Sequence, residues 1–125
     1  MANELIPFYE PGKRITCQAT AAVTGKRFVI ITANRQADGS LSAAHATAAG
    51  AALGVSTYDA AIGEKFGVIR GGVVPVTAGG TIAAGARVEV GTNGQAVTLA
   101  SGIPAGICVN GATAGQDAQI ALTLL

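Results

Sequence analysis

Closely spaced turn signals limit the fold of this chain more than any other feature of its sequence. Six dipeptides that favour chain reversal follow one another: Thr24-Gly25, Asp38-Gly39, Gly71-Gly72, Gly79-Gly80, Asn93-Gly94 and Asn110-Gly111. Asn93-Gly94 lies between alternating apolar residues at 88–90 and 97–99, which is the strongest short-range signal for a β-hairpin. Many short segments separated by turns indicate a mainly β fold. We therefore predict a small single-domain β-barrel or β-sandwich of short antiparallel strands, with an extended N-terminal arm.

The segments between the turns have the apolar patterns of short strands. Residues 14–20 (RITCQAT) alternate apolar and polar side chains, whereas residues 27–33 (RFVIITA) carry the continuous apolar run of a strand buried on both faces. Further candidates follow at 65–71, 73–79, 87–91, 96–100, 105–111 and 118–125. The Ala-rich residues 41–54 do not fit this series, because Ala favours helix while Gly50 weakens one. We expect a surface excursion at about 34–53, with a short helical turn.

The length of 125 residues predicts one domain, with residues 13–125 as a single β domain and residues 1–12 as an arm. Pro7 and Pro11 exclude a central strand from the arm. The arm also carries Ile6, Phe8 and Tyr9, whose apolar side chains need a surface to pack on. Two surfaces remain open to them: the end of the chain's own barrel and the surface of a partner.

One pattern occurs four times: a small or apolar residue, a glycine three positions later, and apolar residues six and eight positions later. The copies are Ala22 to Ile30, Ala60 to Val68, Ile82 to Val90 and Ala112 to Ile120. Their glycines (Gly25, Gly63, Gly85 and Gly115) and Gly94 of the hairpin are predicted to be structural turn glycines, where a positive φ has no steric cost. Residues 53–70 and 105–122 also align without a gap, which indicates equivalent hairpins. The spacing of the copies is irregular, so a solenoid is excluded.

The sequence offers few groups for chemistry. His45 is the single histidine and is expected in an exposed loop, and the carboxylates are scattered. Gly25-Lys26 lacks both the first glycine and the Ser/Thr of a phosphate loop, and no Ser or Cys lies in a nucleophile elbow. We expect no catalytic residue, no cofactor and no metal site, and hence no enzyme.

The charge and hydropathy patterns exclude two classes of partner. Eight Lys and Arg against seven Asp and Glu give a net charge of +1 without a basic block, which argues against nucleic-acid binding. The apolar runs are far shorter than the roughly 20 residues of a membrane span. Cys17 and Cys108 stand alone and are expected as buried strand residues.

The core predicted from this composition is thin. The chain has 26 Ala and 18 Gly, so it has few large side chains for its length. Thin cores often depend on self-association or on a partner surface.

Four stretches resemble, in order, the small capsid decoration (cement) proteins of tailed bacteriophages. They are PGKRITCQATAAVTGKRFVI (11–30), LGVSTYDAAIGEKFGVIRGGVVPV (53–76), AAGARVEVGTNGQAVTL (83–99) and PAGICVNGATAGQDAQIALTLL (104–125). The characteristic parts are the Pro11-Gly12 entry, the turn at 22–26, the hairpin at 54–64 and the C-terminal strand. The chain departs from the family pattern in its longer arm and in the excursion at 34–53.

The resemblance implies a structural virion protein made in the host cytoplasm. Such a protein binds the outer surface of an assembled capsid through the major capsid protein, commonly as a homotrimer, and stabilises the shell without a cofactor, a nucleic acid or a membrane. We expect Ile6, Pro7, Phe8, Tyr9 and Pro11 to form a capsid-docking arm. Another minor virion component, such as a head-fibre or tail protein, and a carbohydrate-binding β domain remain as alternatives. Aromatic residues make up only 4% and Trp is absent, which leaves little for stacking on sugars.

Overall fold

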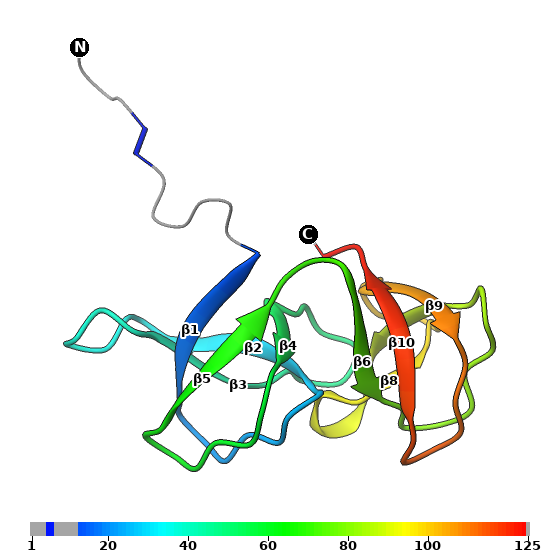
Figure 1. The fold of residues 1–125 in the computed structure, drawn as a ribbon, viewed down its shortest axis with the longest axis horizontal. Coiled ribbons are helices and arrows are strands. Elements are labelled where there is room, and N and C mark those ends of the chain that lie inside the picture. Colours follow the sequence, from blue (N-terminus) through cyan, green and yellow to red (C-terminus); the bar gives the residue numbers. More distant parts are fainter. Residues whose placement is uncertain (1–4, 7–12, 125) are drawn as a thin grey trace.

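The computed structural model describes residues 5–6 and 13–124, and strands form nearly all of its regular structure (Figure 1). The strands are β1 (Arg14–Ala19), β2 (Phe28–Ala33), β3 (Leu41–His45), β4 (Gly54–Ser56), β5 (Lys65–Ile69), β6 (Val73–Thr77), β7 (Arg87–Val90), β8 (Ala96–Thr98), β9 (Gly106–Asn110) and β10 (Asp117–Leu122). A 3₁₀ turn, η1 (Thr92–Gly94), joins β7 to β8. No α-helix occurs among these residues, so the predicted mainly β fold is confirmed.

The first five strands form a closed barrel in the order β1-β3-β2-β4-β5. All its strand pairs are antiparallel except β1–β3, which is parallel. The alternation predicted for residues 14–20 places Ile15, Cys17 and Ala19 inside, where Cys17 lies opposite Phe66 of β5. Phe66, Val29 and Val68 complete the centre of this core with no exposed surface.

The other five strands form a sheet in the order β6-β10-β9-β7-β8. A parallel bridge between Ala78 and Ala96 links the two ends of this sheet, so it curls almost into a second barrel. Val76, Ile82, Val88 and Ile120 fill its interior and are at most 2% exposed.

The two halves repeat one topology. We call residues 14–69 module 1 and residues 73–122 module 2; β6 to β10 then correspond, in chain order, to β1 to β5. The isolated bridge Val23–Ala60 of module 1 matches Ile82–Ala112 of module 2. The parallel pair Ala19–Ala43 likewise matches Ala78–Ala96. The gapless alignment of 53–70 with 105–122 therefore covers one part of a duplication that extends over both modules.

The repeated turns carry positive φ at four equivalent positions. These are Lys26 (60°), Gly63 (86°), Gly85 (88°) and Gly115 (84°). The prediction is wrong for Gly25, which lies one residue before the position with positive φ. Gly25 is instead required by a close approach, because a Cβ there would lie 2.9 Å from Tyr58 Cα.

The predicted excursion at 34–53 is also wrong for residues 41–45. These residues form β3, which pairs with β1 on one side and β2 on the other. Ser42 and Ala43 are fully buried there, and the Ser42 hydroxyl donates to the carbonyl of Asn34 at 2.9 Å. Short side chains suit a strand that is covered on both sides, and the Ala-rich composition therefore does not produce a helix. His45 lies at the end of this strand and is half-buried, whereas a loop position was expected.

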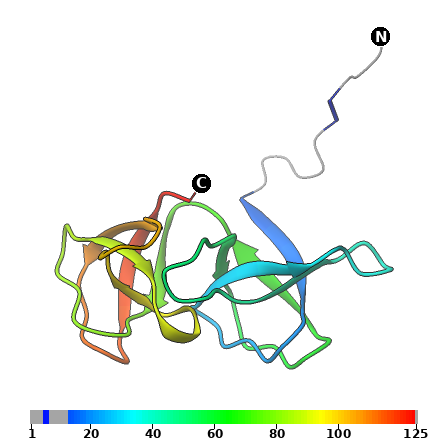
Figure 2. The ribbon, with the colours of Figure 1, turned by 180° about the vertical axis from the view of Figure 1, so that it is seen from behind.

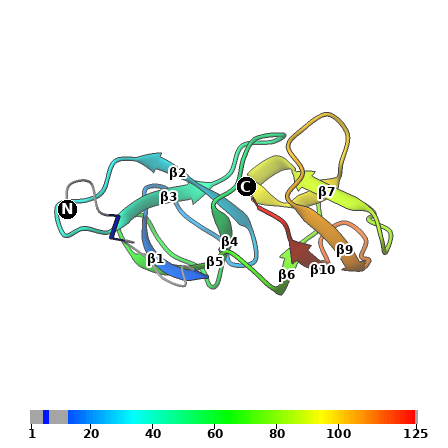
Figure 3. The same ribbon diagram turned by 90° about the horizontal axis from the view of Figure 1, so that it is seen from above.

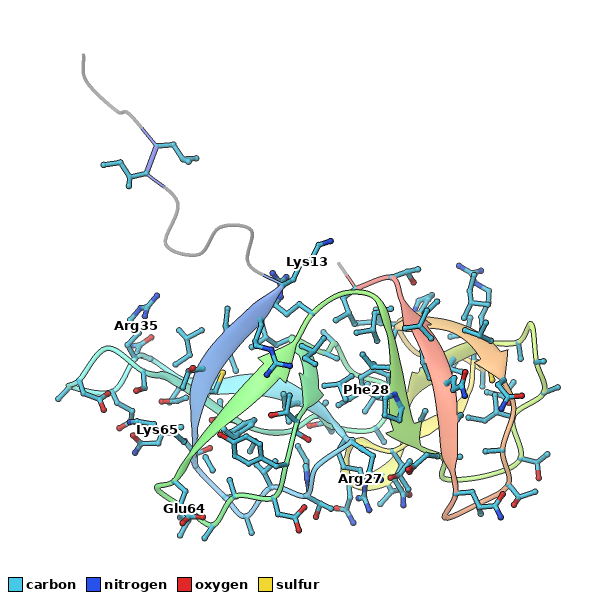
Figure 4. The ribbon with its side chains drawn as sticks, viewed as in Figure 1. Lys13, Arg27, Phe28, Arg35, Glu64 and Lys65 are labelled. Atoms are coloured by element: carbon cyan, nitrogen blue, oxygen red, sulfur yellow. The ribbon has the colours of Figure 1, made fainter. Side chains whose placement is uncertain are left out.

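The modules share part of their cores. Phe28 and Val55 of module 1 are 0% and 3% exposed and belong to the cluster that fills module 2. The Thr77 N–H of β6 donates to the Lys26 carbonyl at 3.0 Å, and η1 packs so closely that a Cβ on Gly94 would clash with Phe28 O. Figures 2 and 3 show the modules side by side, and Phe28 lies between them in Figure 4.

Candidate docking surfaces

The predicted arm falls mostly outside the described residues. Pro7, Phe8, Tyr9 and Pro11 all lie outside them, whereas Ile6 is described and is 80% exposed. Its neighbour Leu5 is 85% exposed. These two apolar side chains are not buried against either module, so their surface is available to a partner.

The arm enters module 1 at an edge where several segments meet. The Lys13 carbonyl accepts a hydrogen bond from Arg70 N–H at 2.8 Å, which fixes the start of β1 beside the end of β5. The Gly72 carbonyl accepts from Leu122 N–H at 3.0 Å, so the end of β10 lies at the same connection. Figure 1 shows the start of β1, the β5–β6 connection and the C-terminal end along one edge. The start of β1 therefore lies beside the connection between the two modules.

A second apolar surface covers the outside of module 2. Val73 of β6, Ala121 of β10 and Ile107 of β9 form one row across three adjacent strands. In the next row, Pro75 lies opposite the polar Gln119, and Val109 lies at the irregularity of β9 beside Gln119. Arg87 of β7 lies opposite Ile107 at the other side of the first row. Val73, Ile107 and Val109 are 58%, 44% and 53% exposed. We call the five apolar residues Val73, Pro75, Ile107, Val109 and Ala121 the β6–β10–β9 face. Their exposed side chains, with Gln119 and Arg87 beside them, form a candidate contact surface.

A cleft of about 230 Å³ opens between the modules. Its lining consists of Arg14, Lys26, Val55, Ser56, Thr57, Ile69, Val74 and Pro75. The Lys26 ammonium at its edge donates to Asp117 Oδ2 at 2.6 Å and lowers the pKa of the Asp117 carboxyl. Because both side chains are about half exposed, this ion pair adds little to stability, and it mainly fixes the position of β10 beside module 1.

Basic residues concentrate before the start of module 2. Seven of the eight Lys and Arg precede residue 73, and Arg87 is the eighth. Lys65 donates to Asp38 Oδ2 at 2.6 Å, and this bond holds the pKa of the Asp38 carboxyl well below its usual range. Figure 4 shows Lys65 and Arg35 toward one end of module 1 and Lys13 at the arm edge. Most of the basic side chains of the chain therefore belong to module 1 and the residues beside it.

Burial determines the protonation of the two cysteine thiols. Burial raises the pKa of the Cys17 thiol to about 11 and also raises that of Cys108, which keeps both thiols protonated. Both cysteines are free and buried in strands, as predicted. Within residues 5–6 and 13–124, no group of three His, Cys, Asp or Glu side chains is placed to hold a metal ion. No described helix is long and apolar enough to span a membrane.

The fold is similar to that of a solved phage protein. The crystal structure of the head fiber gp8.5 N base of bacteriophage phi29 aligns with a TM-score of 0.74 at 24% sequence identity. The alignment covers 88% of this chain and 92% of that one, so the likeness extends over both modules. A comparison with curated proteins gave no match.

A comparison with protein families identifies the chain directly. Residues 9–124 match the family described as phage cement protein, and the match includes every strand of both modules. The likeness of four stretches noted in the sequence is thus part of a match over nearly the full length. The chain is a member of the phage cement protein family.

Proposed function

We propose that this chain is a decoration protein that binds the outer surface of an assembled phage capsid and stabilises the shell. The observation that carries the proposal is the family match over residues 9–124, which spans both modules. The protein acts without catalysis or cofactor, and its partner is the major capsid protein of the same phage. The exposed apolar surfaces support this view, because a protein that works alone seldom leaves such surfaces open.

The arm is the element that we assign to the capsid. Leu5 and Ile6 are at least 80% exposed, and burial of each on a capsid surface would contribute roughly 1.5–3 kcal/mol. Pro7 and Pro11 reduce the entropy that the arm loses when it becomes ordered. Copies of the chain associate as homotrimers in this proposal, so several arms act together and their weak contacts add up.

A head-fibre role is the second candidate. It is favoured by the fold that the chain shares with the N base of the phi29 head fibre. A minor virion component outside the shell lattice would occur in fewer copies than a decoration protein, which we expect at a number comparable to that of the capsid protein. Quantification of this chain in purified virions separates the two roles.

Binding to undecorated capsids tests the role of the arm. The full chain is expected to co-sediment with capsids and to raise the temperature at which they break open. Deletion of residues 2–10 should leave the melting temperature of the free protein unchanged and weaken capsid binding at least tenfold. Unchanged binding, or a much lower melting temperature, would show that the arm is not the capsid anchor.

A further inference from the structure

The cleft between the modules contains a cation without a partner in the described part of the chain. Arg14 lines this cleft, and no described carboxylate forms an ion pair with it. Lys26, the other cation of the lining, is already bound to Asp117 at 2.6 Å. Arg14 is therefore the charged group of the cleft that remains for a ligand.

A glycine on β5 makes room for the Arg14 guanidinium at the cleft. Arg14 begins β1 opposite Ile69 of β5, and its Nη1 lies 3.8 Å from the place that a Cβ on Gly67 would take. The same Cβ would lie 2.9 Å from Thr57 Oγ1, which also lines the cleft. In module 2 the position equivalent to Gly67 carries Gln119, so this opening over a glycine is particular to module 1.

The rest of the lining is mostly apolar. The hydroxyls of Ser56 and Thr57 already donate to backbone carbonyls, at 2.7 Å and 3.0 Å, so their protons are not available to a ligand. The apolar side chains of the lining come from both modules and are those of Val55, Ile69, Val74 and Pro75. The cleft thus combines apolar walls with a single available cation.

The size and chemistry of the cleft define the group that fits it. Its volume of about 230 Å³ is below the roughly 300–1,000 Å³ of pockets for small molecules, and it suits one apolar side chain. An Arg guanidinium pairs best with a carboxylate, because the two planar groups form parallel charge-assisted hydrogen bonds. An extended segment that carries an apolar side chain next to Asp or Glu meets both conditions.

We propose that the cleft between the modules binds a segment of the capsid protein in which an apolar residue is next to Asp or Glu. The apolar side chain enters the cleft, and the carboxylate pairs with Arg14. Arg14 follows Lys13, where the arm enters module 1, so the arm and the cleft contact neighbouring parts of one partner. This inference rests on the proposed function, for which it names a second contact and its chemistry.

A charge reversal tests the carboxylate. Arg14→Glu is expected to weaken binding to undecorated capsids at least about tenfold, because it removes a charge-assisted pair and adds a repulsion between like charges. Arg35→Glu is the matched control: it makes the same change at an exposed position that does not line the cleft, and it should alter binding less than about threefold. Equal losses in the two variants, or no loss in Arg14→Glu, would overturn the inference.

A larger side chain in the cleft tests the apolar part. Ile69 lines the cleft, is half-buried and belongs to neither core cluster, so Ile69→Trp fills the cleft and leaves the cores unchanged. The variant is expected to bind capsids at least about tenfold more weakly. Ile62→Trp makes the same exchange at a 71% exposed position outside the lining and should bind as the unaltered protein does. Circular dichroism and melting temperature verify that all four variants fold.

Capped dipeptides test the cleft without capsids. In an NMR titration, acetyl-Phe-Glu-amide is expected to shift the backbone amide signals of Val55, Ile69 and Val74, and acetyl-Phe-Gln-amide to bind at least about fivefold more weakly. Arg14→Glu should abolish the difference between the two dipeptides. Unchanged signals with both dipeptides would overturn the assigned chemistry. Binding that appears only after deletion of residues 2–10 would assign the cleft to the arm's own Phe8-Tyr9-Glu10, which also overturns the inference.

The two experiments keep this inference separate from the proposed function. Equal capsid binding by the unaltered protein and all four variants would overturn the inference and leave the proposed function intact. An unaltered protein that never binds capsids would overturn the proposed function, while preference of its cleft for the Glu dipeptide would still support the chemistry inferred for the cleft.

Discussion

At the scale of single residues, the four equivalent turns show which glycines are needed for φ and which for space. Gly63, Gly85 and Gly115 have positive φ and open space where a Cβ would be. Lys26 holds the same position in the first turn at φ 60°. There, the Ser56 hydroxyl donates to Thr24 O at 2.7 Å and accepts from Arg27 N–H at 3.2 Å, which bridges the turn. A side chain from β4 thus supports a strained residue that the other turns avoid by using glycine.

Gly115→Ala is expected to destabilise the fold by about 1–2 kcal/mol, because Ala is strained in the left-handed conformation and its methyl group makes no new contact there. Gly80→Ala is the matched control, since Gly80 also has open space around it but no positive φ. The control is expected to be neutral or to stabilise by up to about 1 kcal/mol. Urea unfolding of both variants measures the difference, and equal stabilities would contradict the role of φ.

His45 makes the stability depend on pH. Burial lowers its pKa, and the Thr24 N–H donates to His45 Nε2 at 2.9 Å, which requires the neutral ring. The unfolded chain then binds more protons than the folded one near pH 6, so stability falls as the pH drops below about 6.5. We expect the melting temperature to fall between pH 7 and 5 in the unaltered protein and to fall less in His45→Gln. The same fall in both proteins would exclude His45 as the cause.

The residue scale also shows where sequence reasoning is limited. The copy that begins at Ala22 matches the pattern because Gly25 is present, yet the structural register places Lys26 at that position. A glycine selected for its close approach to Tyr58 cannot be distinguished by sequence from one selected for positive φ. Tyr58 approaches Gly25 only in the folded protein, because the two residues are far apart in the sequence. The sequence alone therefore does not reveal this contact.

At the scale of elements, the predicted hairpin is confirmed and also holds the modules together. β7 pairs with β8 in antiparallel register, and Asn93 and Gly94 both have positive φ. The tip, η1, rests on the backbone of Phe28, while Arg27 Nη1 donates to Asn93 O at 3.2 Å. The local signal for the hairpin is strong because the turn type demands these residues. Its contact with β2 depends on residues far away in the sequence.

For β3, in contrast, the local sequence predicts a different structure from the one that forms. Its residues carry no alternation, and Ala is a good helix former, so local propensity favours a different structure. Pairing with two neighbouring strands decides the outcome, and such tertiary pairing overrides weak local preference.

Gly94→Ala tests whether the β7–β8 hairpin holds the two modules together. A Cβ would clash with Phe28 O and would also require a left-handed conformation, so we expect a loss of more than about 2 kcal/mol. Gly85→Ala has the same φ penalty but open space, and it should cost about 1–2 kcal/mol. Thermal unfolding of the pair measures the cost of the lost contact. Equal losses would show that η1 does not hold the modules together.

At the scale of the whole molecule, the duplication explains how a chain with few large side chains builds its core. Each module is small, and one cluster of buried residues runs from Phe28 and Val55 into the interior of module 2. Small cores gain stability when they are joined, because the fraction of buried surface rises with size. The sequence predicts a single β domain over residues 13–125. In terms of stability, this means that the two modules are expected to unfold together, as one cooperative unit.

Two matched substitutions test whether unfolding is shared. Phe28 lies between the modules, and Phe66 lies only in the core of module 1. Both are fully buried, so Phe28→Leu and Phe66→Leu are each expected to cost about 1 kcal/mol. If the modules unfold together, Phe66→Leu speeds the exchange of the slowest amide hydrogens of β10 as much as those of β5, about fivefold for each kcal/mol. If β10 keeps its protection in Phe66→Leu and loses it only in Phe28→Leu, the modules unfold separately and residues 13–125 are not one cooperative unit.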